Sequence, residues 1–242
     1  MLNEASVRRL AHEYRSRSLY RVCGGALIAA GLLFALSLLA GGGSFPQDLP
    51  ELRSAAAPGR VALLWLAVAA PALVAGALLA IARQYRGTSN EAWVLLALAM
   101  NLIGGSLLTL AFALGAVGAP AALAATRALD PGAASALALT PVALVATSAS
   151  AVGGMLSWLS LLPLSVALTR DRLWPRAAAW GAGIVAIAEV VAAPALRGHG
   201  AAEPLLRLAG YGYLVLLGLS CLRLVGTLRS AAIQAERASE EG

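Results

Sequence analysis

One carboxyl group stands out in this sequence because it falls inside a long apolar block. Glu189 lies in the run WGAGIVAIAEVVAAPAL. A charged side chain at membrane depth costs about 2.5–3.5 kcal/mol to insert, and such residues are candidates for ion or proton sites. Glu189 therefore predicts a proton- or cation-binding site. The alternative is a structural role, in which the carboxyl group caps a neighbouring helix or pairs with an arginine such as Arg197 or Arg207.

A second polar candidate is Asn101, in the apolar run AMNLIGGSLLTL. Small and hydroxyl residues follow it and recur in a later block at spacings of three and four residues, which lets membrane helices approach closely and hydrogen-bond across the contact. Helix packing is our first explanation of these residues, and a polar substrate path lined by Asn101 is the second. The packing candidates are Gly104, Gly105, Ser150, Gly153 and Gly154.

Several kinds of chemistry are excluded by what the sequence lacks. All 18 basic residues are arginine, so no lysine is available for a Schiff base with retinal or pyridoxal phosphate. The two histidines, His12 and His199, lie outside the apolar blocks, so we expect no bis-histidine haem. Cys23 and Cys221 form no metal-binding spacing, and a disulfide between them is not expected in a reducing compartment. Since no catalytic or nucleotide motif is present, we expect no metal, no cofactor and no enzyme activity.

The composition places the chain in a membrane. Sixty per cent of the residues are hydrophobic and only 12% are charged, whereas a soluble domain carries about 25% charged residues. The apolar residues form six blocks near the roughly 20 residues that a helix needs to cross a hydrocarbon core of about 30 Å. The predicted fold is an all-α transmembrane bundle with spans at 22–40, 61–82, 92–118, 136–168, 174–196 and 205–228.

The fourth of these blocks, residues 136–168, is too long for one straight span. We expect it to start as an interfacial segment, or to tilt and kink at Pro163. The first block follows a basic leader, residues 1–21, in which apolar residues recur at helical spacing. This leader predicts an amphipathic helix in the membrane interface, with a solvated basic segment as the alternative. Residues 229–242 form a polar tail.

The arginines predict the orientation of the bundle. If the N-terminus is cytoplasmic, thirteen arginines fall in inner segments and five in outer segments. This asymmetry follows the positive-inside rule and predicts that both termini are cytoplasmic. A nucleic-acid partner is not expected, because a nucleic-acid surface would gather these charges on one soluble face.

Residues 160–228 carry a further pattern. One helix ends in a short basic turn, followed by a Trp or Leu, a Pro-Arg pair and a helix that starts with small residues. These features are Arg170, Asp171, Arg172, Leu173, Trp174, Pro175, Arg176, Trp180, Gly181 and Gly183. The pattern resembles an uncharacterised six-helix family of bacterial integral membrane proteins, a domain of unknown function. The resemblance implies a six-helix bundle and no known activity. We separately expect the chain in the bacterial cytoplasmic (inner) membrane.

Two main hypotheses for the function remain. The leading one is a non-enzymatic accessory or structural subunit of a larger membrane assembly, because catalytic groups are lacking and packing faces abound. Its partners would be the lipid bilayer and either other membrane proteins or further copies of the chain. The alternative is a transporter or permease for ions or small molecules that uses Glu189 and Asn101. A membrane enzyme comes third, because the outer loops offer only scattered acidic residues and His199.

Overall fold

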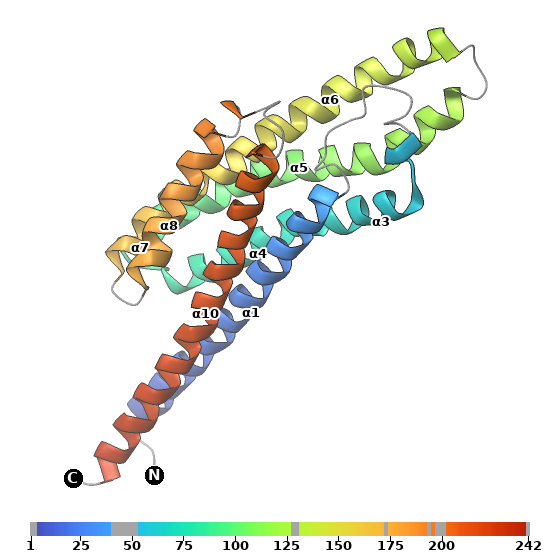
Figure 1. Cartoon of the computed structure of the whole chain (residues 1–242). Helices are drawn as coiled ribbons and strands as arrows, with labels where there is room; N and C mark the ends of the chain where they lie inside the picture. Colours follow the sequence, from blue (N-terminus) through green and yellow to red (C-terminus); the bar gives the residue numbers. More distant parts are fainter. Residues whose placement is uncertain are drawn as a thin grey trace.

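The computed structural model of the chain describes residues 4–39, 53–126, 131–171, 174–192, 195–196 and 202–240. Every regular element in these ranges is helical, so the predicted all-α fold is confirmed (Figure 1). The elements are α1 (Glu4–Leu39), α3 (Pro58–Ala67), α4 (Ala69–Gln84), α5 (Glu91–Thr126), α6 (Pro131–Leu159), α7 (Leu161–Arg170), α8 (Arg176–Ile187), the π-helix η1 (Ala188–Ala192) and α10 (Ala202–Glu240).

Five stretches of this structure are long and apolar enough to cross a membrane, which confirms a multi-pass membrane protein. They are Arg17–Leu38, Pro58–Gln84, Glu91–Ala124, Pro141–Arg170 and Ala202–Gly226. The remaining predicted span, 174–196, is helical over the twelve residues of α8 and the five of η1. At a rise of 1.5 Å per residue these cover about 25 Å, slightly less than the hydrocarbon core. The sixth crossing therefore stays a prediction.

Two prolines interrupt the spans one turn before their own positions. A proline has no N–H to bond the carbonyl four residues earlier, and its ring clashes with that carbonyl. The long fourth block breaks at Ser160, between α6 and α7. The break directly follows Leu159, whose carbonyl oxygen would accept a hydrogen bond from residue 163 if that residue were not proline. This agrees with the predicted kink at Pro163. The second span breaks in the same way after Ala67, four residues before Pro71, a break that was not predicted from the sequence.

Helices α1 and α10 form a long antiparallel pair, with the N- and C-termini at the same end of the molecule (Figure 1). Their backbones approach closely where Gly24 of α1 faces Gly218 of α10, because neither residue has a side chain in the contact. A Cβ added to Gly24 would lie 2.8 Å from the Gly218 carbonyl oxygen. Next to this contact the Cys23 and Cys221 sulfur atoms are 3.4 Å apart as free thiols. The leader predicted as a separate interfacial helix is helical from Glu4, but it continues into the first span without a break.

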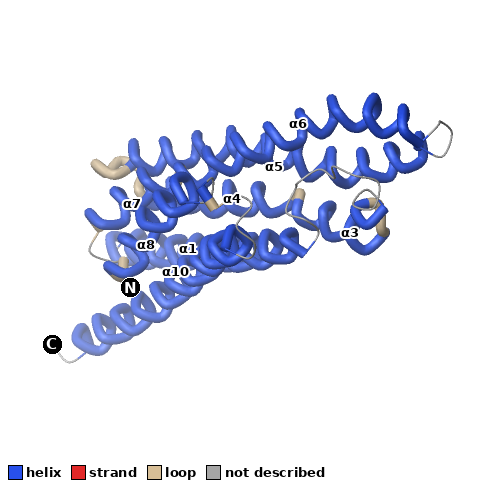
Figure 2. Tube along the Cα trace, turned by 45° about the horizontal axis from the view of Figure 1, so that its top comes forward, coloured by secondary structure: helices blue, strands red, loops and turns tan. Residues whose placement is uncertain are grey.

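The other helices pack beside this pair. Figure 2 shows α5 and α6 along one side of the molecule and α1 and α10 along the other, with α4 in contact with both α1 and α5. The buried core is rich in alanine, whereas large apolar side chains such as Leu32, Ile103 and Val152 are exposed. A water-soluble protein rarely exposes so much apolar surface. This outward-facing apolar surface is suited to lipid.

Candidate site: a polar cavity inside the helix bundle

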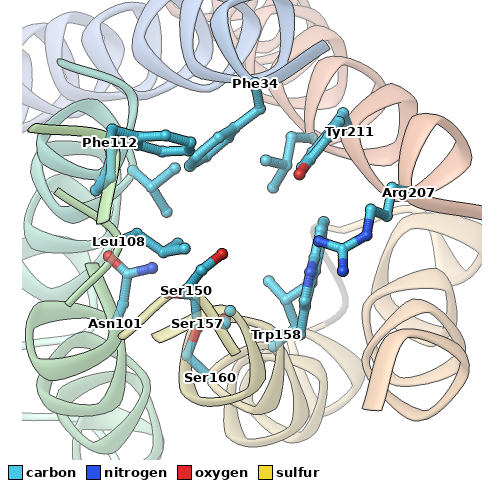
Figure 3. A pocket seen from close by; sticks show the side chains of 15 residues that line it. Phe34, Asn101, Leu108, Phe112, Ser150, Ser157, Trp158, Ser160, Arg207 and Tyr211 are labelled. Atoms are coloured by element: carbon cyan, nitrogen blue, oxygen red, sulfur yellow. The ribbon is translucent and has the colours of Figure 1, made fainter. Parts of the chain in front are cut away.

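A cavity of about 40 Å³ lies inside the helix bundle (Figure 3). Such a volume holds roughly three water molecules at about 10–15 Å³ each. Its lining residues come from α1, α4, α5, α6, α7 and α10 and from the turn at Ser160. They are Phe34, Pro71, Val74, Asn101, Leu108, Phe112, Ser150, Gly154, Ser157, Trp158, Ser160, Leu161, Arg207, Tyr211 and Leu214.

One side of the cavity carries polar side chains from α5 and α6. Asn101 is 3% exposed, and its Oδ1 atom has no hydrogen-bond partner among the described residues. The Ser157 Oγ atom is also buried without a partner, while the Ser160 hydroxyl donates to the Ser157 carbonyl oxygen at 2.6 Å. Buried polar atoms in proteins are nearly always hydrogen-bonded. Unpartnered atoms around a space of this size therefore indicate a place for water or a small polar solute.

A row of aromatic rings borders the same cavity. Phe34 of α1 stacks on Tyr211 of α10 with ring centroids 5.2 Å apart, and Tyr211 stacks on Trp158 of α6 at 5.7 Å. Phe112 of α5 extends the row, with its ring 6.3 Å from that of Phe34. Offset contacts at these distances are favourable for aromatic rings. The row fixes four helices around the cavity and gives it one apolar wall.

Glu189 lies beside this cavity rather than in its lining. It belongs to the π-helix η1, is 5% exposed, and its Oε1 atom has no hydrogen-bond partner in the part of the chain that the structure describes. The carboxyl group packs into a notch at Gly210 of α10, where an added Cβ would lie 2.5 Å from Oε1 and 2.8 Å from the Trp158 ring. Short π-helical turns often occur at functional sites. The Trp158 ring, which lines the cavity, thus lies at the same notch as the Glu189 carboxyl group.

Arg207 is a charged residue of the cavity lining. Its guanidinium group lines the cavity on the side opposite Asn101 (Figure 3). It is paired with Glu203 at 2.8 Å, one turn earlier on α10, and its charge acts on Glu189. Among the described residues no salt bridge joins Glu189 to Arg207, so the predicted structural pairing is only indirect. The other suggested partner, Arg197, lies outside the described residues.

The five small-residue candidates have different surroundings. Gly104 and Gly153 face each other across the α5–α6 contact, where a Cβ added to either would lie 2.7 Å from the carbonyl oxygen of the other. Gly105 is next to the Pro71 ring, at 3.0 Å from an added Cβ. Gly154 and Ser150 instead line the cavity, and nothing lies within 4 Å of a Cβ added to Gly154. On α6, Gly153 therefore packs closely against α5, whereas the neighbouring Gly154 lines the cavity.

Several cavity residues were not candidates in the sequence. Arg207 was considered only as an outer-segment arginine and a possible partner of Glu189, although its spacing from Glu203 is that of an i, i+4 ion pair. Trp158 and Tyr211 carry no sequence signal, because aromatic residues are common in membrane helices. No group of three or more potential metal ligands from His, Cys, Asp and Glu occurs in the part of the chain that the structure describes.

Comparisons with known proteins give no family assignment. No protein-family model matches the sequence, and no curated protein or solved structure matches the chain. The resemblance to a six-helix bacterial family thus stays an expectation drawn from residues 160–228.

Proposed function

We propose that the chain is a non-enzymatic carrier in the bacterial cytoplasmic membrane, which binds a small polar solute in the bundle cavity and exchanges a proton at Glu189. The observation that carries this proposal is the set of unpartnered polar atoms, Asn101 Oδ1 and Ser157 Oγ, around one cavity. A bundle that served packing alone would gain stability from apolar residues at these positions, because a buried polar atom without a partner costs about 1–3 kcal/mol.

The proposed topology has six crossings with both termini in the cytoplasm. Helix α8 starts near the end of α7 and runs towards the start of α10 (Figure 1), which suits a segment that returns the chain across the membrane. The end of the bundle with the α4–α5 and α7–α8 turns carries exposed arginines. They are Arg21, Arg83, Arg86, Arg170, Arg176 and Arg223. Their concentration there favours the cytoplasmic side.

The size and polarity of the cavity limit the solute. Room for roughly three water molecules suits a solute of a few non-hydrogen atoms. The amide of Asn101 and the serine hydroxyls offer both donors and acceptors. Arg207 is already paired with Glu203, so it adds little net charge. A small uncharged or zwitterionic solute fits this set best.

Glu189 supplies the coupling site in this proposal. A carboxyl group at membrane depth with an unpartnered oxygen is suited to taking up and releasing a proton. Arg207 acts on Glu189 and lines the cavity, so it links the charge on Glu189 to the solute site. The accessory-subunit hypothesis loses one of its supports, because small-residue faces such as Gly104 with Gly153 are used within the chain.

Reconstitution of the full chain into liposomes that contain a pH-sensitive dye tests the proposal. A panel of glycine, alanine, urea, glycerol and formamide would be added outside, and both solute uptake and internal pH would be followed. We expect at least one solute to enter with proton movement, Asn101→Leu to abolish uptake, and Glu189→Gln to abolish the pH change. Ser106→Ala is the matched control on α5, because this hydroxyl is exposed and bonded to the Leu102 carbonyl oxygen. A panel in which no solute enters, or full uptake by Asn101→Leu, would refute the proposal.

A further inference from the structure

A second hollow lies far from the polar cavity, at the end of the bundle where α7 turns into α8. It is a groove of about 800 Å³, lined by residues of the last turn of α7 and the first turns of α8. They are Leu168, Thr169, Arg170, Asp171, Trp174, Arg176, Ala179 and Trp180. A hollow of this size is within the range of small-molecule binding sites. The chemistry of the lining side chains indicates the class of ligand.

The groove presents two arginines and a helix N-terminus. Arg170 lies over the Trp93 ring, with its guanidinium carbon 5.6 Å from the ring centroid, and this cation–π contact holds it in place. Arg170 and Arg176 are both exposed, and neither forms a salt bridge to a described acidic residue. Helix α8 begins at Arg176 after Pro175, without a side-chain cap. Free N–H groups at a helix N-terminus favour an anion.

The Trp174 indole gives an independent sign of a ligand. Trp174 lines the groove and is 4% exposed, and its ring packs edge-on against Tyr20 at a centroid distance of 6.1 Å. Its Nε1–H group is buried without a hydrogen-bond acceptor among the described residues. The Tyr85 hydroxyl is a neighbour of this indole but forms no hydrogen bond of good geometry with it. The Tyr85 hydroxyl donates a hydrogen bond to the Asp171 carboxylate at 2.6 Å. An acceptor oxygen in the groove would satisfy the Trp174 donor.

Among the described lining residues, one carboxylate, that of Asp171, stands against the two guanidinium groups of Arg170 and Arg176. The Asp171 carboxylate accepts a hydrogen bond from the Tyr85 hydroxyl at 2.6 Å, and the two positive charges of the arginines exceed its one negative charge. The groove therefore keeps a net positive charge. Its donors, two guanidinium groups, an indole N–H and the first turn of α8, are those that bind phosphate oxygens.

An apolar stripe leads away from the groove along α8. Arg176, Trp180, Ile184 and Ile187 follow one another at spacings of four, four and three residues, so they share one face of the helix. The three apolar members are 64%, 65% and 56% exposed, respectively. This face is about 16 Å long from Arg176 to Ile187. A charged end followed by an apolar stripe of this length matches a phospholipid, with its headgroup at Arg176 and an acyl chain along α8.

We propose that the groove between α7 and α8 binds the phosphate headgroup of an anionic phospholipid, with an acyl chain along Trp180, Ile184 and Ile187. The continuous apolar stripe favours a lipid over a soluble phosphate compound, which would not use it. The site is independent of the proposed carrier function, because it lies at another part of the bundle. It also differs from a general attraction of basic residues to anionic lipid, since it uses a buried indole donor and a defined groove.

Native mass spectrometry of the purified full chain in mild detergent tests this site with palmitoyl-oleoyl phosphatidylglycerol and, as a neutral lipid, palmitoyl-oleoyl phosphatidylcholine. We expect the wild type to bind phosphatidylglycerol at least tenfold more tightly. Each arginine near an anionic headgroup contributes about a fivefold factor, so Arg170→Gln with Arg176→Gln should weaken phosphatidylglycerol binding by roughly 25-fold. Trp174→Phe keeps the ring but removes the donor, and it should weaken binding by about fivefold.

The matched control is Arg83→Gln with Arg86→Gln, which removes the same charge from exposed positions in the last turn of α4 and just after it, at the same end of the bundle. It should change phosphatidylglycerol binding less than twofold. Equal losses in the two double variants would show that only general charge attraction acts, and would overturn the proposal. Displacement of phosphatidylglycerol by millimolar inorganic phosphate would overturn the choice of a lipid, because it would show that the phosphate group alone accounts for the affinity.

Discussion

The contact between α5 and α6 yields a sharp comparison between two adjacent glycines. A Cβ added to Gly153 would lie 2.7 Å from the Gly104 carbonyl oxygen and 2.8 Å from the Leu107 Cβ atom, so the helices must move apart. A Cβ added to Gly154 meets nothing within 4 Å. Overpacking in a tight core typically costs about 1–3 kcal/mol. Replacing glycine by alanine inside a helix gains about 0.5–1 kcal/mol.

Because both glycines are inside α6, the helical gain is common to both variants and cancels in their difference. Gly154→Ala should therefore be neutral or more stable than the wild type by up to about 1 kcal/mol. Gly153→Ala should be less stable than Gly154→Ala by about 1–3 kcal/mol. Reversible unfolding in mixed micelles with increasing dodecyl sulfate, followed by circular dichroism, gives both free energies of unfolding.

Because Gly153 and Gly154 are neighbours, any general effect of a glycine-to-alanine change in a membrane helix is the same in both variants and cancels in their difference. Equal free energies for the two variants would refute the close approach of Gly104 and Gly153. A lower stability for Gly154→Ala than for Gly153→Ala would reverse the assignment of packing and cavity faces.

Two further predictions concern the end of the bundle with the termini. Burial, and then the hydrogen bond to Asp171, raises the pKa of the Tyr85 hydroxyl well above its ordinary value. The folded state therefore keeps this proton while the unfolded chain loses it above about pH 10. Tyr85→Phe should lower the free energy of unfolding by about 1.5–3 kcal/mol at pH 7. This difference between wild type and variant should shrink as the pH rises above about 10. A difference that does not depend on pH would contradict the prediction. Since the Cys23 and Cys221 sulfur atoms lie 3.4 Å apart, hydrogen peroxide should oxidise the two thiols to a disulfide within one chain, with release of two waters. The intact mass should fall by two hydrogens, and this loss should be absent in Cys23→Ser. Cross-linking only between chains would disprove this prediction.

Much of this fold could be predicted because the membrane constrains each helix locally. A span needs a certain apolar length whatever surrounds it, so five of the blocks in the sequence correspond to observed membrane-length helices. Pro163 also acts locally, because the bond that it removes belongs to its own helix. By the same reasoning Pro71 could have been recognised as a break in the second span. Block length alone did not reveal it, since the span around Pro71 is of ordinary length.

The continuity of α1 was not predictable from its amphipathic leader. Basic residues and helical spacing suit both a helix in the membrane interface and one that extends into water. The structure extends α1 beside the last part of α10 (Figure 1), where the two helices run in contact. The course of the leader thus involves a helix that is distant in the sequence.

The candidate site was predictable only in its local members. Asn101 and Glu189 were visible because a polar residue in an apolar block is conspicuous at one position. The aromatic row and Arg207 were not, since their roles depend on α1, α6 and α10 meeting at one place. Such contacts between distant segments leave no pattern in a single sequence.

A substitution of Asn101 distinguishes a solute-binding role from a helix-packing role, because the two roles predict changes of opposite sign in the free energy of unfolding. Its Oδ1 atom is buried without a partner and therefore lowers the stability of the empty bundle. Leucine at this position removes the unpartnered atom, and the adjacent cavity of about 40 Å³ accommodates most of the extra volume. If the asparagine serves a solute, Asn101→Leu should unfold at equal or higher denaturant than the wild type while solute uptake is lost. If it serves helix packing, the same variant should lose about 1 kcal/mol or more, as for other broken buried hydrogen bonds. One unfolding titration on one variant thus distinguishes the carrier from a purely structural bundle.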